Sequence, residues 1–177
     1  MTLEDFLKLA ETRRSVRSYR PDPVDTEVLR GVLRAASLAP SACNRQPWKF
    51  VVVTEEPRRR ALGVAYNREW FWTAPAIVAV CVEPSAGWVR PFDGKSYAFV
   101  DGAIAMDHLT LAAAAAGLGT CWIGAFEPEA AASALGLPDG WEIVAMTPVG
   151  YPAPETNPRT RSRRPLGESL VRERWNV

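Results

Sequence analysis

The chain is poor in the residues from which most metal sites and nucleophilic triads are built. It contains one histidine, His108, and three cysteines, at positions 43, 81 and 121, that show no paired spacing. A histidine-rich cluster and a zinc site of paired cysteines are therefore excluded, and we expect free thiols and no bound metal. Any serine or cysteine triad would have to use His108 as its base.

Several motifs of nucleotide-dependent enzymes and hydrolases are also missing. The chain has no phosphate-binding loop, no dinucleotide fingerprint of three spaced glycines and no nucleophile elbow. With so few acid and base groups, chemistry on this chain would belong to a bound cofactor.

Net charge is nearly absent as well. Among 177 residues, 21 are basic and 20 acidic, which gives a formal charge of +1. The chain therefore lacks the positive field of a general nucleic-acid binder, and any anion site must be local.

The first twenty residues contain no apolar signal segment, and Asp101 and Asp107 interrupt the apolar stretch from Val100 to Leu118. We expect a cytoplasmic chain without a membrane span.

Apolar spacing predicts helices and strands within one domain that covers residues 1–177. Asp25 is the expected cap of the second helix, Gly136 is the expected stop of the last helix, and the proline-rich tail from Pro152 onward is expected to lean on another surface. The first two strands are continuous apolar runs, which is typical of strands buried on both faces. The expected helices cover residues 3–10, about 26–39, 57–70, 97–118 and 128–135, and the expected strands cover residues 50–53, 76–82, 120–123 and 142–149.

Two arginine-rich segments stand near opposite ends of the chain, at residues 13–17 and 161–164. If the fold brings them together, their guanidinium groups and the Ser15 hydroxyl would form a local phosphate site, because arginine matches phosphate oxygens bidentately. The alternative is that each segment is a solvated basic loop.

A turn rich in proline and amide side chains precedes the first strand. Residues 40–48 read PSACNRQPW, a composition typical of a rigid loop that presents polar groups. Asn44 and Gln46 can each donate and accept hydrogen bonds, as binding the edge of a heterocycle requires. The alternative is an ordinary turn whose amides cap the neighbouring backbone.

Glycines flank an aromatic residue in the segment 119–124, which reads GTCWIG. Glycine in a strand can mark the close approach of a ligand or of another backbone, whereas Trp122 could equally pack in the core. Asp101 and Asp107 lie six positions apart on the expected long helix and do not share a face cleanly, so we do not interpret them as an acid and base pair.

Five segments taken together resemble the nitroreductase family in their order and spacing. They are RRSVRSY at 13–19, PSACNRQPW at 40–48, GTCWIG at 119–124, PVGYP at 148–152 and the arginine-rich tail. Each motif alone is weak, but the five together cover nearly the whole chain. The resemblance implies an α+β fold with a mixed sheet flanked by helices. It also implies an intertwined homodimer with two FMN sites at the interface.

The resemblance also implies which residues would contact FMN. Arg17 is the candidate for stabilising the negative charge that develops near flavin N1 on reduction. The phosphate and ribityl chain would be held by Arg13, Arg14, Ser15 and Arg17, with Arg161 and Arg163 closing over the phosphate and Arg164 as the alternative to Arg163. The ring would be approached by Pro40, Ser41, Ala42, Asn44 and Gln46 from the partner subunit, and by Trp122, Ile123 and Gly124 on its other side.

The implied activity is that of an FMN-dependent NAD(P)H oxidoreductase. NADH or NADPH would deliver hydride to the flavin and leave, and a small-molecule acceptor such as a nitroaromatic, quinone or enone would then take the electrons, in a ping-pong sequence without a catalytic protein residue. Two alternatives are open. One is a different flavin chemistry on the same fold, such as dehalogenation, flavin fragmentation or dehydrogenation, and the other is a non-enzymatic flavin-binding dimer.

The chain is shorter than the larger members of the family between the first strand and the long helix. The lid over the substrate is therefore expected to be reduced, or rebuilt from residues 66–72 and 88–92, whose aromatic side chains could stack on a planar substrate. Packing at the surface or at an interface is the alternative for these aromatic residues.

Overall fold

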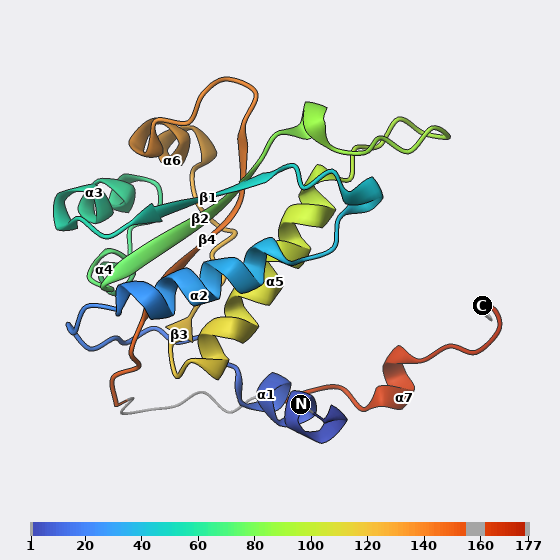
Figure 1. Ribbon diagram of the computed structural model, residues 1–177, viewed down its shortest axis with the longest axis horizontal. Helices are drawn as coiled ribbons and strands as arrows, with labels where there is room; N and C mark the ends of the chain where they lie inside the picture. Colours follow the sequence, from blue (N-terminus) through green and yellow to red (C-terminus); the bar gives the residue numbers. More distant parts are fainter. Residues whose placement is uncertain (1, 155–161, 176–177) are drawn as a thin grey trace.

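The chain folds into three layers, with a four-stranded sheet between two groups of helices (Figure 1). This computed structural model describes residues 2–154 and 162–175. The strands lie in the order β1 (Trp48–Val53), β2 (Ala76–Val82), β4 (Glu142–Gly150) and β3 (Gly119–Thr120), and all neighbours pair antiparallel. A parallel bridge between Ser15 and Thr120 adds a parallel pairing at the β3 edge. The expected α+β class is confirmed.

Strand β2 separates two hydrophobic cores. Alternate side chains of a strand point to opposite faces. Ala76, Val78 and Val80 accordingly pack with α2 (Thr26–Ser37) and α5 (Ala98–Ala115). The alternate residues Ile77, Ala79 and Cys81 pack with α4 (Glu69–Trp72) and α6 (Pro128–Leu135) on the other face. All seven β2 residues are buried, as the continuous apolar run predicted.

Most of the expected helices form where their sequence signals place them. The Asp25 carboxylate caps α2, because it accepts the backbone N–H groups of Glu27 and Val28 at 2.8 and 3.0 Å. Gly136 ends α6 in a left-handed conformation with φ 63°. Helix α1 spans Leu3–Thr12. Helix α5 is long and apolar enough to cross a membrane by length and composition, and here it packs against α2, β2 and β4.

The polar helix expected over residues 57–70 is wrong as a single element. The segment forms α3 (Glu56–Ala61), a 3-10 turn η2 (Leu62–Val64) and the short α4. Leu62 and Phe71 are both fully buried in the same core. Nine residues of continuous helix would place them on opposite faces, so the chain must break between them.

Strand β1 also differs from its expectation, because it is an edge strand. Its central residues are half-buried, Val52 is exposed and Lys49 is exposed. A run of valines cannot by itself distinguish a central strand from an edge, since that depends on the order in which strands assemble.

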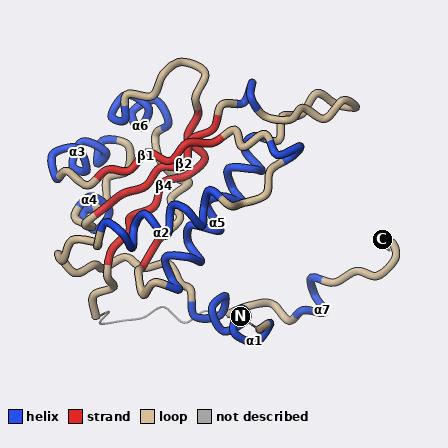
Figure 2. Tube along the Cα trace, viewed as in Figure 1, coloured by secondary structure: helices blue, strands red, loops and turns tan. Residues whose placement is uncertain are grey.

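The tail carries one short helix, α7 (Leu166–Ser169). Residues 162–175 are exposed along their whole length, and they extend away from the body of the molecule as an arm (Figures 1 and 2). The arm is outside the two cores, in agreement with the expectation that the tail builds no core of its own.

Candidate functional site

A pocket of about 360 Å³ brings the two ends of the chain together. Arg13 and Ser15 come from the segment after α1, Trp122 comes from the segment after β3, and Arg163 comes from the tail. The full lining is Phe6, Ala10, Arg13, Ser15, Asp107, Thr110, Leu111, Trp122 and Arg163. Of the two tail arginines at 163 and 164, Arg163 is the one that lines the pocket.

Backbone pairing fixes the first arginine segment beside β3. The Val16 N–H donates to the Thr120 carbonyl oxygen at 2.8 Å, and the Val16 side chain is 3% exposed. Gly119 permits this approach, because a Cβ at that position would lie 2.8 Å from the Val16 side chain. Farther along, Tyr19 bridges Pro152 at the exit of β4. The segments 13–19, 119–124 and 148–152 therefore meet at one place.

Arg13 and Arg14 of the extended segment differ in the cavities that they line. Side chains two positions apart share a face of an extended chain, so Arg13 and Ser15 both line the pocket. Arg14 and Val16 line a second, smaller hollow of about 180 Å³ with Gly119 and residues near it, and Arg13 lines this hollow as well. Arg14 therefore does not line the pocket that holds Ser15 and Arg163, whereas Arg13 lines both cavities.

Arg17 lies beside the aromatic segment that follows η2. Its guanidinium carbon is 5.9 Å from the centre of the Trp70 ring, within the range of a cation–π contact. Tyr66 stands edge-on to Trp70 and to Phe71, with ring centres 5.8 and 5.3 Å apart. Because Phe71 is fully buried, this aromatic cluster is anchored in the core.

The segment after β3 divides between pocket and core. Trp122 is 42% exposed and lines the pocket, whereas Ile123 is buried and pairs with Met146 of β4. Gly124 is exposed. The Ile123 side chain thus belongs to the core, and its backbone N–H and carbonyl groups pair with Met146, so this residue does not line the pocket.

The loop from Pro40 to Gln46 lies at the other end of α5. Its Ala42 N–H donates to Oδ1 of Asp101, in the first turn of α5, at 3.0 Å. The α5 residues that line the pocket begin at Asp107, so a rise of 1.5 Å per residue separates the two places by about 9 Å or more along the helix. The five loop residues predicted to approach a ring, none of which lines this pocket in the same chain, are Pro40, Ser41, Ala42, Asn44 and Gln46.

Comparison with known protein families identifies the family of this chain. The sequence profile described as Nitroreductase family matches residues 10–68 and 62–151, which is more than half of the chain. The chain belongs to the nitroreductase family. The matched residues include both the arginine segment and the loop at 40–48.

Relatives and solved structures agree with this nitroreductase assignment. A 5,6-dimethylbenzimidazole synthase from Rhodospirillum rubrum is 34% identical and covers 83% of this chain and 82% of its own. A Bacillus subtilis protein named FMN reductase (NAD(P)H) is 26% identical over 90% of this chain and 70% of its own. The crystal structure of a nitroreductase family protein from Clostridium difficile is 32% identical, with a TM-score of 0.88 over 99% of this chain and 100% of that one.

Some residues of the nitroreductase pocket were not expected from the sequence. Phe6 and Ala10 of α1 and Asp107, Thr110 and Leu111 of α5 all line it. Ala10 lies four positions after Phe6, and Thr110 and Leu111 lie three and four positions after Asp107. These spacings place each group on one helical face, and this is the signal that could have found them. The Asp107 carboxylate stands in the same wall as the two arginines. Arg161, predicted to reach the phosphate, lies outside the described residues.

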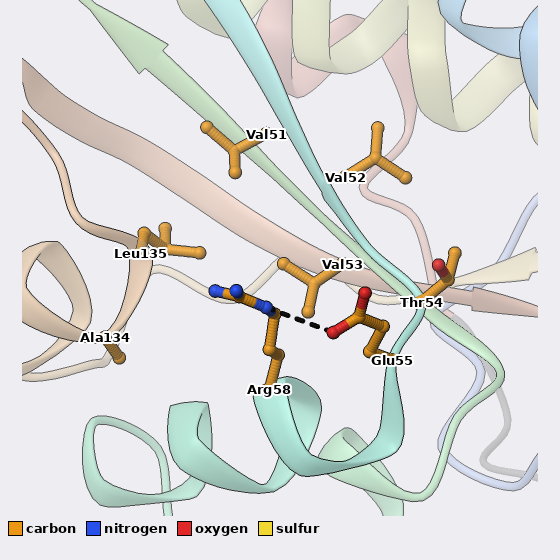
Figure 3. A pocket seen from close by; sticks show the side chains of 8 residues that line it. All are labelled: Val51, Val52, Val53, Thr54, Glu55, Arg58, Ala134 and Leu135. Atoms are coloured by element: carbon orange, nitrogen blue, oxygen red, sulfur yellow. Dashed lines mark hydrogen bonds and ion pairs between the residues drawn. The ribbon is translucent and has the colours of Figure 1, made fainter.

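A third pocket lies along β1, at the edge of the sheet opposite β3 (Figure 3). Three valines of β1 line it together with Ala134 and Leu135 of α6. Its arginine, Arg58, forms an ion pair with Glu55 at 3.1 Å. This pocket marks the open outer edge of β1 and offers no pair of arginines to an anion. Within residues 2–154 and 162–175, no group of three or more histidine, cysteine or carboxylate side chains could hold a metal ion.

Proposed function

We propose that this nitroreductase-family protein is an FMN-dependent oxidoreductase that takes electrons from NADH or NADPH. The observation that carries the proposal is the pocket in which Arg13 and Arg163, from opposite ends of the chain, meet Ser15 and Trp122. In a chain with a formal charge of +1, two arginines converging on one pocket indicate a local anion site.

The donor set of the pocket fits the phosphate end of FMN. Guanidinium groups match phosphate oxygens with paired hydrogen bonds, and the Ser15 hydroxyl can add a further donor. Arg13, Ser15 and Arg163 would hold the phosphate, and the half-exposed Trp122 would lie along the flavin. The Asp107 carboxylate repels a phosphate, so it favours a geometry in which the arginines lie between the two anions.

Bound FMN would supply the redox chemistry, by accepting hydride from NAD(P)H and passing electrons to an oxidant. The protein would bind and orient the reactants and stabilise charge. Arg17 is the candidate for placing a positive charge beside the ring, and the amides of Asn44 and Gln46 would bind its polar edge. A ping-pong sequence follows if donor and acceptor use the same face in turn, and the acceptor would be a nitroaromatic, quinone or enone.

We also propose that two copies form the complete site as a homodimer. The loop at 40–46 and the pocket lie at different ends of α5, so a second copy is the natural source of the loop residues. Helix α1 buries none of its residues, and the arm at 162–175 is exposed throughout. Both surfaces leave apolar side chains for a second copy to cover.

The cytoplasmic location and the single domain expected from the sequence stay predictions.

A second candidate function is flavin fragmentation, favoured by one specific finding. The relative from Rhodospirillum rubrum is named 5,6-dimethylbenzimidazole synthase, so a different reaction occurs on a similar chain. The two functions differ on the substrate side. Steady oxidation of NADPH with a nitroaromatic or quinone acceptor supports the reductase, whereas loss of the flavin itself during turnover supports fragmentation.

An absorbance spectrum of the pure protein, recorded under nitrogen before and after adding NADPH and, on a second sample, NADH, tests the proposal. We expect a flavin band that bleaches on addition of NADPH and returns with an acceptor. A band that persists with both NADH and NADPH would contradict the oxidoreductase and support a binding role. A protein that shows no flavin band even after incubation with FMN would overturn the assignment of the arginines.

A further inference from the structure

Asp101 is a buried carboxylate whose position calls for an explanation. It is 2% exposed, in the first turn of α5. The helix is pressed onto the sheet here, since a Cβ at Gly102 would lie 2.7 Å from Val82 and 2.8 Å from Val144. Oδ1 of Asp101 accepts the Ala42 N–H at 3.0 Å. Its buried Oδ2 has no hydrogen-bond partner among the described residues. A half-satisfied buried carboxylate costs stability, which a purely structural role does not require.

The loop that Asp101 contacts has an unusual backbone. Cys43, Asn44 and Gln46 have φ values of 51°, 54° and 50°. Residues other than glycine, asparagine and aspartate rarely adopt this left-handed region, so Cys43 and Gln46 are the unusual members. Such residues persist when their surroundings over-determine the conformation, and they gather at functional sites.

Two hydrogen bonds inside the loop support its shape. Ser41 Oγ accepts the Gln46 N–H at 2.9 Å, and the Gln46 side-chain amide donates to Asn44 Oδ1 at 3.1 Å. These bonds close the loop on itself but do not attach it to the body. The Ala42 bond to Asp101 spans 59 positions in sequence and does attach it.

We propose that Asp101 is a positioning residue that fixes the 41–46 loop in its left-handed conformation, so that the loop presents its amide side chains to the flavin. The inference rests on the proposed function for the identity of the ligand. The hold of Asp101 on the loop is independent of that function and can be measured without flavin. A carboxylate at the start of a helix interacts favourably with the helix dipole even when it is solvated. That interaction therefore does not explain why Asp101 is buried against the loop, whereas the proposed role in holding the loop does.

Hydrogen exchange on the flavin-free full chain tests the hold directly. Asp101→Ala and Asp101→Leu both remove the acceptor, and leucine also fills the space, so at least one of them should fold. We expect amides at 41–46 to exchange about tenfold faster in both variants, the change for losing one charge-assisted hydrogen bond. Exchange in β2 should stay as in the unchanged protein. Asp101→Asn keeps an oxygen for the Ala42 N–H and should restore protection, and the exposed Asp139→Asn is the matched control.

Two measurements separate this inference from the proposed function. Unchanged exchange at 41–46 in the alanine and leucine variants, or faster exchange in β2 by the same factor, would overturn the role of Asp101. Faster exchange confined to the loop, with weaker FMN binding in a fluorescence titration, supports the role of Asp101 and the flavin site together. Faster loop exchange with unchanged FMN affinity supports Asp101 as the anchor and contradicts the contact between this loop and the flavin.

Discussion

At the scale of single residues, two neighbouring arginines of the tail offer a matched comparison. Arg163 lines the pocket with Arg13, and Arg164 is the adjacent residue that does not. We expect Arg13→Gln and Arg163→Gln each to weaken FMN affinity by about 10- to 100-fold, the effect of losing a hydrogen bond between charged groups. Arg164→Gln should change it much less. Quenching of FMN fluorescence measures the dissociation constants, and a larger loss in Arg164→Gln than in Arg163→Gln would reverse the assignment.

A second residue-scale prediction concerns pH. Burial raises the pKa of the Cys81 thiol to about 12 from an ordinary value of 9.0. The unfolded chain releases this proton at the lower value, so the stability contributed by the thiol is complete below pH 9.0 and is lost as the pH rises toward about 12. We expect the free energy of unfolding to fall by up to about 1.4 kcal/mol per pH unit in this window.

Two cysteine variants isolate that slope. Cys81→Ala should abolish the dependence of the unfolding free energy on pH in this window, and should lower that free energy by the same amount at every pH because of the cavity. Cys43→Ala, at an exposed thiol, should retain the dependence on pH. Urea unfolding under reducing conditions, at about pH 8 and about pH 10, gives the free energies of unfolding. The same slope in Cys81→Ala as in the unchanged protein would show that other groups cause the loss.

At the scale of elements, the hairpin between β2 and α5 is built to hold its shape. Val89 bridges Ser96, Arg90 forms an ion pair with Asp93, and the Arg90 guanidinium donates to the Tyr97 hydroxyl at 2.9 Å. Phe92, near the tip, is 94% exposed. The segment that leads into the hairpin is tied to the residue that follows the loop at 40–46, because the Glu83 N–H donates to the Pro47 carbonyl oxygen at 2.9 Å. If the loop at 40–46 faces the flavin, as proposed, the exposed aromatic side chain of Phe92 on this hairpin would form a wall for planar acceptors.

Phe92→Ala tests that role of the hairpin. We expect the KM for a nitroaromatic acceptor to rise about 2- to 10-fold, the loss of one aromatic contact. The KM for ferricyanide, which needs no stacking, should not change. The exposed Val64→Ala on η2 is the control. Equal effects on both acceptors would mean that Phe92 acts on folding or assembly instead.

At the scale of the whole molecule, the exposed arm and α1 predict a dimer. Light scattering on the full chain at micromolar concentration should give twice the mass of one chain. Leu170→Asp places a charge among the apolar side chains of the arm and should shift the equilibrium toward monomers, whereas the exposed Glu168→Gln should not. A monomer in the unchanged protein would contradict the dimer and leave the flavin site without its second half.

Local signals in the sequence determined much of the architecture. The cap at Asp25, the stop at Gly136, the burial of β2 and the long apolar helix depend on residues close in the chain, so helical spacing and strand composition suffice to predict them. The family resemblance was also a property of the sequence, because the order and spacing of its motifs survive without coordinates. These signals say which segments form, but not which side chains meet.

Tertiary structure alone decided the contacts between distant segments. The break between Leu62 and Phe71 arises because both must enter one core, and β1 is an edge because of strand order. Pairing with Thr120 places Ser15 in the pocket that also holds Arg163, and Arg14 only in the smaller hollow beside it. The bond from Ala42 to Asp101 joins residues 59 positions apart. Such contacts depend on how elements pack in three dimensions, and no periodicity along the chain encodes them.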